Sequence, residues 1–216
     1  MTSDRTNIYQ LYTESAAEQK AVAKYAPLIK DGVLEGDVSL SGGDFTKIPS
    51  IFKGIKVTGH FWCSVNQLTS LEGAPQSVGG MFYCDGNQLT SLAGAPQSVG
   101  GNFNCINNQL TSLEGSPQSV GKDFFCFFNQ LTSLKGAPQS VGGDFWCSDN
   151  QLTSLKGGPQ RVGGNFNCSN NQLVSLEGAP QRVGGKFTWA NNPHLDIIVS
   201  VKHIPVKHRP GVLSLL

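Results

Sequence analysis

The stretch GHFWCSVNQLTSLEGAPQSVG, Gly59 to Gly79, decides the fold, because the chain repeats it with little change. Each copy is 21 residues long, and the copies begin at residues 59, 80, 101, 122, 143 and 164. A seventh copy begins at residue 185 and decays after Asn192. A fixed period of this length predicts a solenoid, in which each unit stacks on its neighbours and all units share one core.

The unit contains one short strand followed by a long return. The segment Phe-x-Cys alternates inward and outward positions, which predicts a strand with Phe and Cys on its buried face. The remaining apolar positions of the first unit are expected to fill the interior with them: Phe61, Cys63, Leu68, Leu71, Pro75 and Val78. The return is short and rich in Gly and Pro, so turns and extended or 3-10 segments are expected there rather than a full helix.

The pattern V-x-x-x-F-x-C-x-x-N-x-L resembles the leucine-rich-repeat signature L-x-x-L-x-L-x-x-N-x-L, with one extra residue at the Gly-Gly pair. The stretch L-T-S-L-x-G-x-P is similar to short bacterial leucine-rich repeats. The repeated segments NQLTSLEGAP and PQSVGG resemble those of leucine-rich-repeat proteins of tailed phages. The resemblance covers about residues 36 to 192. It implies a leucine-rich-repeat solenoid with a parallel β-sheet on a concave face, an Asn bonded to backbone in each turn, and a protein-binding function.

The domain organisation follows from where the repeat begins and ends. Residues 1–35 are expected to form an N-terminal helical cap, with apolar positions at helical spacing between residues 7 and 29. Residues 36–58 read as a degenerate capping repeat with Val38 and Leu40 in the strand positions. Residues 59–192 are the tandem repeats. Residues 193–216 form a C-terminal cap and tail, with an apolar sealing segment at 197–201 and a basic, solvated end at 202–209.

Two columns of polar or reactive residues are interpreted as structural. The Cys residues recur once per unit, which predicts a stack of buried free thiols; neither disulfides nor the clustered spacing of a zinc site fits this regularity. An Asn follows three residues after each Cys and is expected to bond backbone groups in the turn. We therefore expect no metal and no cofactor.

Composition argues against several classes of function. A net charge of +1 gives no argument at the level of the whole protein for binding nucleic acid or an anionic membrane, and no apolar run is long enough to span a membrane. The first residues do not resemble a signal peptide, and reduced thiols suit the cytoplasm, which would be the host cytoplasm for a phage-encoded protein. The Ser residues occupy repeated structural positions and the His residues lie near the ends, so no catalytic constellation is expected and the chain is not predicted to be an enzyme.

Function is expected where the copies differ. Outward positions of the strand vary from copy to copy, and several carry large aromatic side chains with carboxylates beside them. Such a patch is typical of a partner-binding surface. The predicted partner-binding residues are Trp62, Tyr83, Asp85, Ile106, Asp123, Phe125, Phe127, Phe128, Asp144, Trp146 and Asp149.

The preferred hypothesis is a protein-binding scaffold that uses this aromatic, acid-rimmed face. A partner with an apolar protrusion and basic residues would fit it, and the phage resemblance suggests a host factor such as a defence component. Carbohydrate binding on the same face is the alternative, because Trp and Tyr platforms flanked by Asp and Asn also suit sugars. Self-association, and cross-strand aromatic stacking that only stabilises the sheet, are further alternatives.

Overall fold

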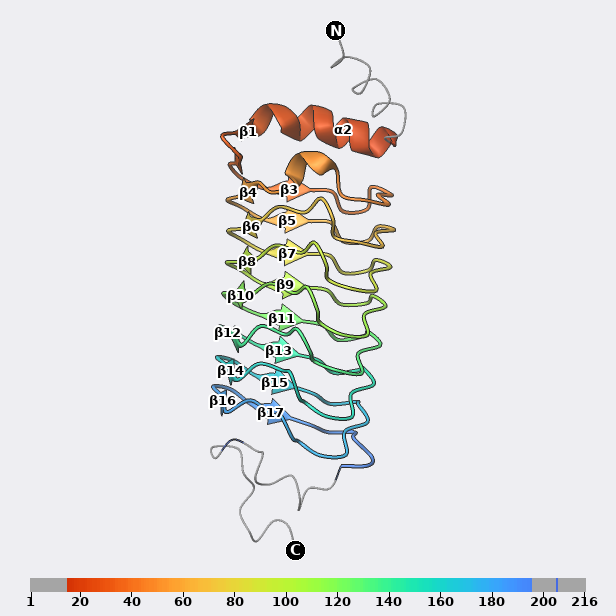
Figure 1. Ribbon diagram of the computed structural model, residues 1–216, viewed down its shortest axis with the longest axis vertical. Coiled ribbons are helices and arrows are strands. Elements are labelled where there is room, and N and C mark those ends of the chain that lie inside the picture. The colour runs from red at the N-terminus through yellow and green to blue at the C-terminus, as the bar shows by residue number, and fades with distance from the viewer. Residues whose placement is uncertain (1–14, 196–204, 206–216) are drawn as a thin grey trace, which may run out of the picture.

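The computed structural model describes residues 15–195 and residue 205, and shows a parallel β-solenoid closed at one end by a helix (Figure 1). The predicted repeat solenoid with an N-terminal helical cap is confirmed. In the view of Figure 1 the turns stack in a nearly straight column, with α2 lying across its upper end. Each repeat contributes one short strand to each of two sheets.

The first sheet contains the strand predicted from Phe-x-Cys. It has eight parallel strands in the order β17-β15-β13-β11-β9-β7-β5-β3. Equivalent residues of successive turns stand side by side, so that Phe61 pairs with Phe82 and Trp62 with Tyr83. The strands are β3 (Val38–Ser39), β5 (Phe61–Trp62), β7 (Phe82–Tyr83), β9 (Phe103–Asn104), β11 (Phe124–Phe125), β13 (Phe145–Trp146), β15 (Phe166–Asn167) and β17 (Phe187–Thr188).

The second sheet lies on the return of each turn and was not predicted as a separate sheet. It has nine strands, parallel except for the antiparallel pair β1 and β2. Each strand points only one residue, usually Val, into the core, so the sequence shows no alternation there. The strands are β1 (Ile29–Lys30), β2 (Val33–Leu34), β4 (Lys56–Val57), β6 (Ser77–Val78), β8 (Ser98–Val99), β10 (Ser119–Val120), β12 (Ser140–Val141), β14 (Arg161–Val162) and β16 (Arg182–Val183).

A stack of phenylalanine rings runs through the core. From Phe61 to Phe166, one Phe per turn stacks on the next with ring centroids 5.1 to 5.6 Å apart and interplanar angles of 7 to 27°. The Cys, both Leu and the Val of each unit are buried beside these rings, which confirms the predicted interior. Complete burial of each Phe side chain contributes on the order of 2 kcal/mol relative to its exposure, and every turn repeats that contribution.

The Asn column ties each turn to the one before it. The Nδ2 of Asn87 donates to the backbone oxygens of Cys84 in its own turn and Cys63 in the previous turn, both at 3.0 Å. Its Oδ1 accepts the backbone N–H of Leu68 at 3.0 Å. The same set of bonds recurs up to Asn192. These buried backbone groups have no strand partner, so the Asn side chains satisfy them, and the predicted structural role of the column is confirmed.

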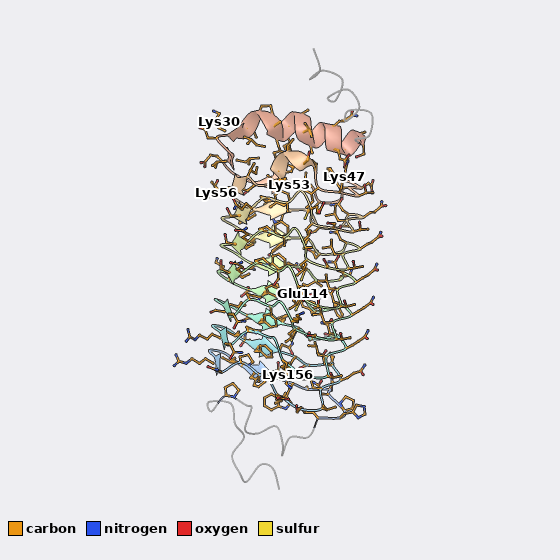
Figure 2. The ribbon with its side chains drawn as sticks, viewed as in Figure 1. Lys30, Lys47, Lys53, Lys56, Glu114 and Lys156 are labelled. Carbon is orange, nitrogen blue, oxygen red and sulfur yellow. The ribbon has the colours of Figure 1, made fainter. Side chains whose placement is uncertain are left out.

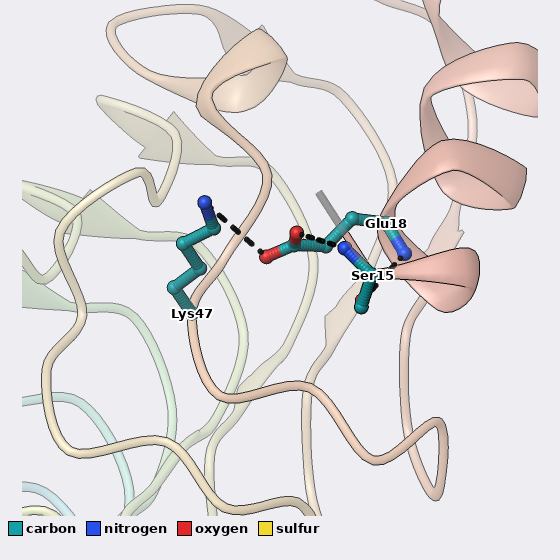
Figure 3. A network of polar contacts seen from close by, with 3 residues as sticks. All are labelled: Ser15, Glu18 and Lys47. Carbon is teal, nitrogen blue, oxygen red and sulfur yellow. Dashed lines mark hydrogen bonds and ion pairs between the residues drawn. The ribbon is translucent and has the colours of Figure 1, made fainter. Parts of the chain in front are cut away.

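Helix α2 (Ala16–Tyr25) closes the N-terminal end of the stack. It begins with a capping box, in which Ser15 and Glu18 bond each other's backbone N–H groups, and Glu18 also lies 3.7 Å from Nζ of Lys47 (Figure 3). Tyr25 packs edge-on against Phe52, which continues the line of core rings. The Tyr25 hydroxyl accepts the N–H of Ser39 at 2.9 Å, so it covers part of the open edge of β3.

The cap differs at its C-terminal end from the predicted helix over residues 7–29, of which residues 7–14 lie outside the described part of the chain. The α-helix ends at Tyr25 and continues as 3-10 helix η1 (Ala26–Leu28), because Pro27 has no N–H to donate to the preceding turn. Leu28 is therefore exposed rather than packed on the first coil. A second 3-10 helix, η2 (Ser50–Phe52), belongs to the degenerate repeat, whose predicted strand is present as β3.

At the other end, β17 and Asn192 keep the pattern of the preceding turns, in agreement with the decay of the repeat after Asn192. The expected sealing segment at 197–201 and the basic end at 202–209, apart from Pro205, lie outside the described residues. Among the helices that the structure describes, none has the length and apolar character needed to cross a bilayer.

Replacing Asn108 by Ala should destabilise the protein strongly. The change leaves the buried N–H of Leu89 and the carbonyls of Cys84 and Cys105 without their side-chain partner. We expect a loss of about 3 kcal/mol in the free energy of unfolding, measured by urea denaturation. The exposed neighbour Gln109 serves as control, and Gln109→Ala should change stability by less than about 0.5 kcal/mol. Similar losses in both variants would contradict a structural role of the Asn column.

Candidate binding face

The predicted partner-binding aromatics lie on the outer surface of the first sheet, which we call the outward face. Trp62 and Tyr83 are paired in register, as are Phe125 and Trp146, and all four side chains are half-buried. Asn104 stands between Tyr83 and Phe125 in the same column. The predicted site is therefore divided into two groups on one face rather than forming a single patch.

The larger group, here called the aromatic cluster, consists of Phe125, Phe127, Phe128 and Trp146. Ring centroids lie 5.3 Å apart for Phe125 and Trp146, 6.0 Å for Phe127 and Trp146, and 5.2 Å for Phe127 and Phe128. The rings are tilted or edge-on to one another, with interplanar angles of 46 to 69°. The cluster therefore presents an uneven apolar surface, not a flat platform.

The second group is smaller. Trp62 packs against the imidazole of His60, with ring centroids 5.1 Å apart. Asp85 lies beside it and accepts hydrogen bonds from the hydroxyl of Ser64 and the amide of Asn104. Ile106 is half-buried in the following turn, between the two groups along the chain. This group is polar at its margin and less apolar than the aromatic cluster.

Phe128 adopts a backbone conformation that disfavours its side chain. Its φ is +53°, and the equivalent residue of every repeat also has a positive φ. The position comes after Cys126 and Phe127, which follow β11, and turns the chain so that the next residue, the Asn of the Asn column, can reach the interior. Most copies use a residue that tolerates this left-handed conformation: Gly86, Asn107, Asp149, Asn170 and Asn191. The exceptions are Val65 and Phe128.

Both exceptions are also exposed, at 66% for Val65 and 57% for Phe128. The left-handed conformation costs a side-chain-bearing residue roughly 1 to 2 kcal/mol, and an exposed apolar side chain recovers little of this cost by burial. Residues that oppose stability in this way are concentrated at functional sites. The backbone strain marks Phe128 and Val65 as functional candidates, and the sequence comparison alone had not singled out Val65.

The carboxylates of the predicted acidic rim have a second, structural role. Asp123 accepts the backbone N–H of Asp144 at 2.8 Å, and Asp144 accepts that of Asn165 at 2.6 Å. The second Gly of the Gly-Gly pair leaves room for this contact, since a Cβ on Gly143 or Gly164 would collide with these oxygens. This role depends on the register between turns and was not predicted.

The rim nevertheless keeps its charge. Within residues 15–195, no ion pair joins Asp85, Asp123, Asp144 or Asp149 to a cation. The carboxylate of Asp149 accepts a hydrogen bond from the amide of Asn170 at 2.8 Å. The outward face thus combines apolar rings with carboxylates whose charge is not neutralised from within this part of the chain.

A recess of about 280 Å³ opens beside Trp146, lined also by Asn165, Asn167, Lys186 and Thr188. The indole N–H of Trp146 is buried and has no hydrogen-bond acceptor among the described residues. An unpaired buried donor is uncommon and costs stability. It is a second unfavourable feature within the aromatic cluster.

The cysteines are excluded as a reactive site by their surroundings. All six are buried and free, as predicted, and the thiol of Cys63 donates to the backbone oxygen of Tyr83 at 3.3 Å. Burial raises the pKa of every one of these thiols well above its ordinary value. They are therefore protonated at neutral pH and act as core side chains.

Two constant columns lie on the surface, contrary to the expectation that repeated positions are fixed by packing. The Gln that follows each Asn of the Asn column, such as Gln67, is exposed in every repeat. The Thr two residues later, such as Thr69, is exposed as well. Val174 replaces this Thr in the last full repeat and is exposed as well. Nothing in the structure explains why these columns are constant.

No protein-family model matches the chain, and neither does any curated protein. Over the part of the chain that the structure describes, His, Cys, Asp and Glu side chains form no group of three or more able to hold a metal ion. The differences between the repeats therefore remain the best indication of function in this chain.

Replacing Val65 by Asn should stabilise the protein. Asn tolerates the left-handed backbone and occupies the same position in three other repeats, so the unfolding free energy should rise by about 1 kcal/mol in urea denaturation. The reciprocal change, Asn107→Phe, should lower it by a similar amount, because the exposed side chain of Asn107 makes no hydrogen bond to the described residues. A lower unfolding free energy for Val65→Asn would contradict backbone strain at Val65.

The thiols should be inert towards a thiol reagent in the folded protein. With dithionitrobenzoate at pH 8, we expect no rapid reaction under native conditions and release corresponding to all six thiols in denaturant. The rate in native buffer should follow the opening of the solenoid and increase in Asn108→Ala. Immediate reaction of one or more thiols in the native protein would contradict their burial.

Proposed function

We propose that the protein is a protein-binding scaffold that contacts its partner through the aromatic cluster on the outward face. The observation that supports this most directly is Phe128, an exposed aromatic residue in a left-handed conformation that is occupied by Asn, Asp or Gly in every other repeat except the first. An aromatic residue at this position weakens the fold but adds a protruding apolar anchor. Large aromatic anchors at the centre of a contact typically contribute most of its affinity.

The chemistry of the face defines the partner. Tilted rings and the recess beside Trp146 accommodate an irregular apolar protrusion better than the flat face of a sugar ring. The surrounding carboxylates favour basic residues on the partner, because complementary charge accelerates association and excludes acidic competitors. We therefore infer a protein whose binding segment carries an apolar side chain beside Lys or Arg.

The sequence of the repeats resembles that of leucine-rich-repeat proteins of tailed phages. On that basis we propose that the partner is a host factor such as a defence component. The encounter would take place in the host cytoplasm. Six free thiols support this location, since free thiols persist in a reducing compartment. We propose no catalytic activity for the chain.

The test is affinity capture from host lysate with the wild-type protein and three variants. Phe125→Ser combined with Trp146→Ser should abolish capture of the partner, and Phe128→Asn should weaken it at least about tenfold, as expected for a central anchor. Phe128→Asn should do so without loss of unfolding free energy, because Asn suits the backbone. The control Val174→Thr removes an exposed apolar side chain from a different column and should leave capture unchanged.

Equal capture by all four proteins would contradict the proposal. Two other outcomes assign the face to an alternative role. Signals on a glycan array that disappear in the Phe125/Trp146 double variant would indicate a carbohydrate site. Concentration-dependent sedimentation that disappears in the same variant would indicate self-association.

A further inference from the structure

The second sheet carries a trough on its outer side, away from the outward face. Two adjoining hollows of about 640 and 660 Å³ share Ser140 and Gly142 and so form one continuous trough. One residue per strand forms its wall, and these residues are Lys56, Ser77, Ser98, Ser119, Ser140, Arg161 and Arg182. The wall thus changes from serine to arginine over the last two strands.

The floor of the trough is bare backbone. From the second repeat on, the Gly after each Val faces the carbonyl of the equivalent Gly in the previous turn, and a Cβ on Gly163 would collide with the oxygen of Gly142. No side chain can therefore fill the space beside the wall. The hydroxyls and guanidinium groups of the wall border an open depression that runs across the turns.

Arg161 and Arg182 stand side by side at one end of this trough. They are paired in register on β14 and β16, which places their backbones about 4.8 Å apart, and both side chains are exposed. Within the described residues, neither guanidinium group has an ion pair or a hydrogen bond from its side chain. Like charges directly opposite each other on neighbouring strands are unfavourable.

The same chain neutralises a comparable pair elsewhere. Lys135 and Lys156 also occupy equivalent positions of successive repeats, but each is bonded to a glutamate of the turn on its other side. Nζ of Lys135 lies 2.7 Å from Glu114, and Nζ of Lys156 lies 3.0 Å from Glu177 (Figure 2 labels Glu114 and Lys156). The column that contains Lys135 and Lys156 thus has balanced charge. The column that contains Arg161 and Arg182 has no ion pair within the described residues. Duplication of a repeat would explain why two successive repeats carry Arg at this position. It would not explain why no carboxylate of the described residues pairs with either of them.

We propose that Arg161 and Arg182 form an oxyanion site that takes a phosphate group. Two guanidinium groups at one strand spacing offer several N–H donors to one ligand, which suits the three or four oxygens of a phosphate better than the two of a carboxylate. Ser140, next in the column, adds a hydroxyl donor at the same edge. The ligand supplies the negative charge that the protein leaves out of this column.

The site is independent of the aromatic cluster, since it lies on the other sheet. The phosphate belongs either to a free inorganic ion or to a monoester on a larger molecule. Pro205 also lines the trough at the end that holds the arginines. These two sources share the same chemistry at the arginines.

The experiment compares the wild-type protein with Arg161→Ser/Arg182→Ser, which restores the residue present in four other repeats. Lys56→Ser is the matched control, because it removes a cation from the opposite end of the same wall. Inorganic phosphate, phenyl phosphate and acetate are titrated at constant ionic strength, with binding followed by calorimetry and the thermal midpoint recorded in parallel. Constant ionic strength removes general screening as an explanation.

The wild type and Lys56→Ser should bind phosphate saturably and show a raised thermal midpoint, as expected for a ligand of the folded state. The double variant should bind at least about tenfold more weakly, since it loses charged donors, and acetate should bind more weakly than phosphate to the wild type. Tighter binding of phenyl phosphate than of inorganic phosphate identifies a monoester as the source, whereas equal binding identifies the free ion.

Equal phosphate binding by the wild type and the double variant, or no saturable binding by any of the proteins, would overturn the proposal. We expect the double variant to fold, because Ser already occupies this position in most repeats. The double variant should also capture the protein partner as well as the wild type does, which separates this site from the proposed binding face.

Discussion

The hydrogen bonds of the Asn column are the interaction on which the rest of the structure depends. Each Asn joins two turns, satisfies backbone groups that no strand reaches, and thereby sets the distance and register between repeats. For the Asn to point inward, the residue before it must leave the strand in a left-handed conformation. The stacked Phe rings, the Cys column and the tight Gly-Gly contacts all require the register that these bonds maintain.

Because of this requirement, the residue type before each Asn shows whether stability alone determines that position. Where stability alone is decisive, the left-handed conformation selects Gly, Asn or Asp, and most repeats conform. Phe128 and Val65 do not conform, and neither is buried enough to offset the cost. In Phe128 the strain coincides with a cluster of three further aromatic side chains, while Val65 lies near Trp62 along the chain. The other repeats thus show which residues suit this position, and the two that do not suit it are the ones for which we propose a role in binding.

Much of the fold could be predicted from the sequence, because packing imposes a period on it. The Phe, Cys and Leu positions repeat since each must be buried, and the Asn repeats since it bonds backbone. The second sheet could not be predicted, because its two-residue strands point a single residue inward and leave no alternation. The bond from Asp123 to the backbone of Asp144 and the strain at Phe128 also escaped prediction, since they depend on register between turns and on a dihedral angle.

A solenoid separates its surfaces in a way that a globular domain does not. Each turn contacts only its neighbours, so an outward substitution changes the stability of two interfaces and leaves distant turns unaffected. One column can therefore keep its charges balanced, as Lys135 and Lys156 do with their glutamates, while another holds Arg161 and Arg182 without a carboxylate partner among the described residues. Because the balanced column shows that neutralisation is attainable at this spacing, the unbalanced one indicates a charge supplied from outside. The same reasoning applies to the outward face, where Asp85 and Asp149 form no ion pair within residues 15–195 and share the face with half-buried aromatic rings.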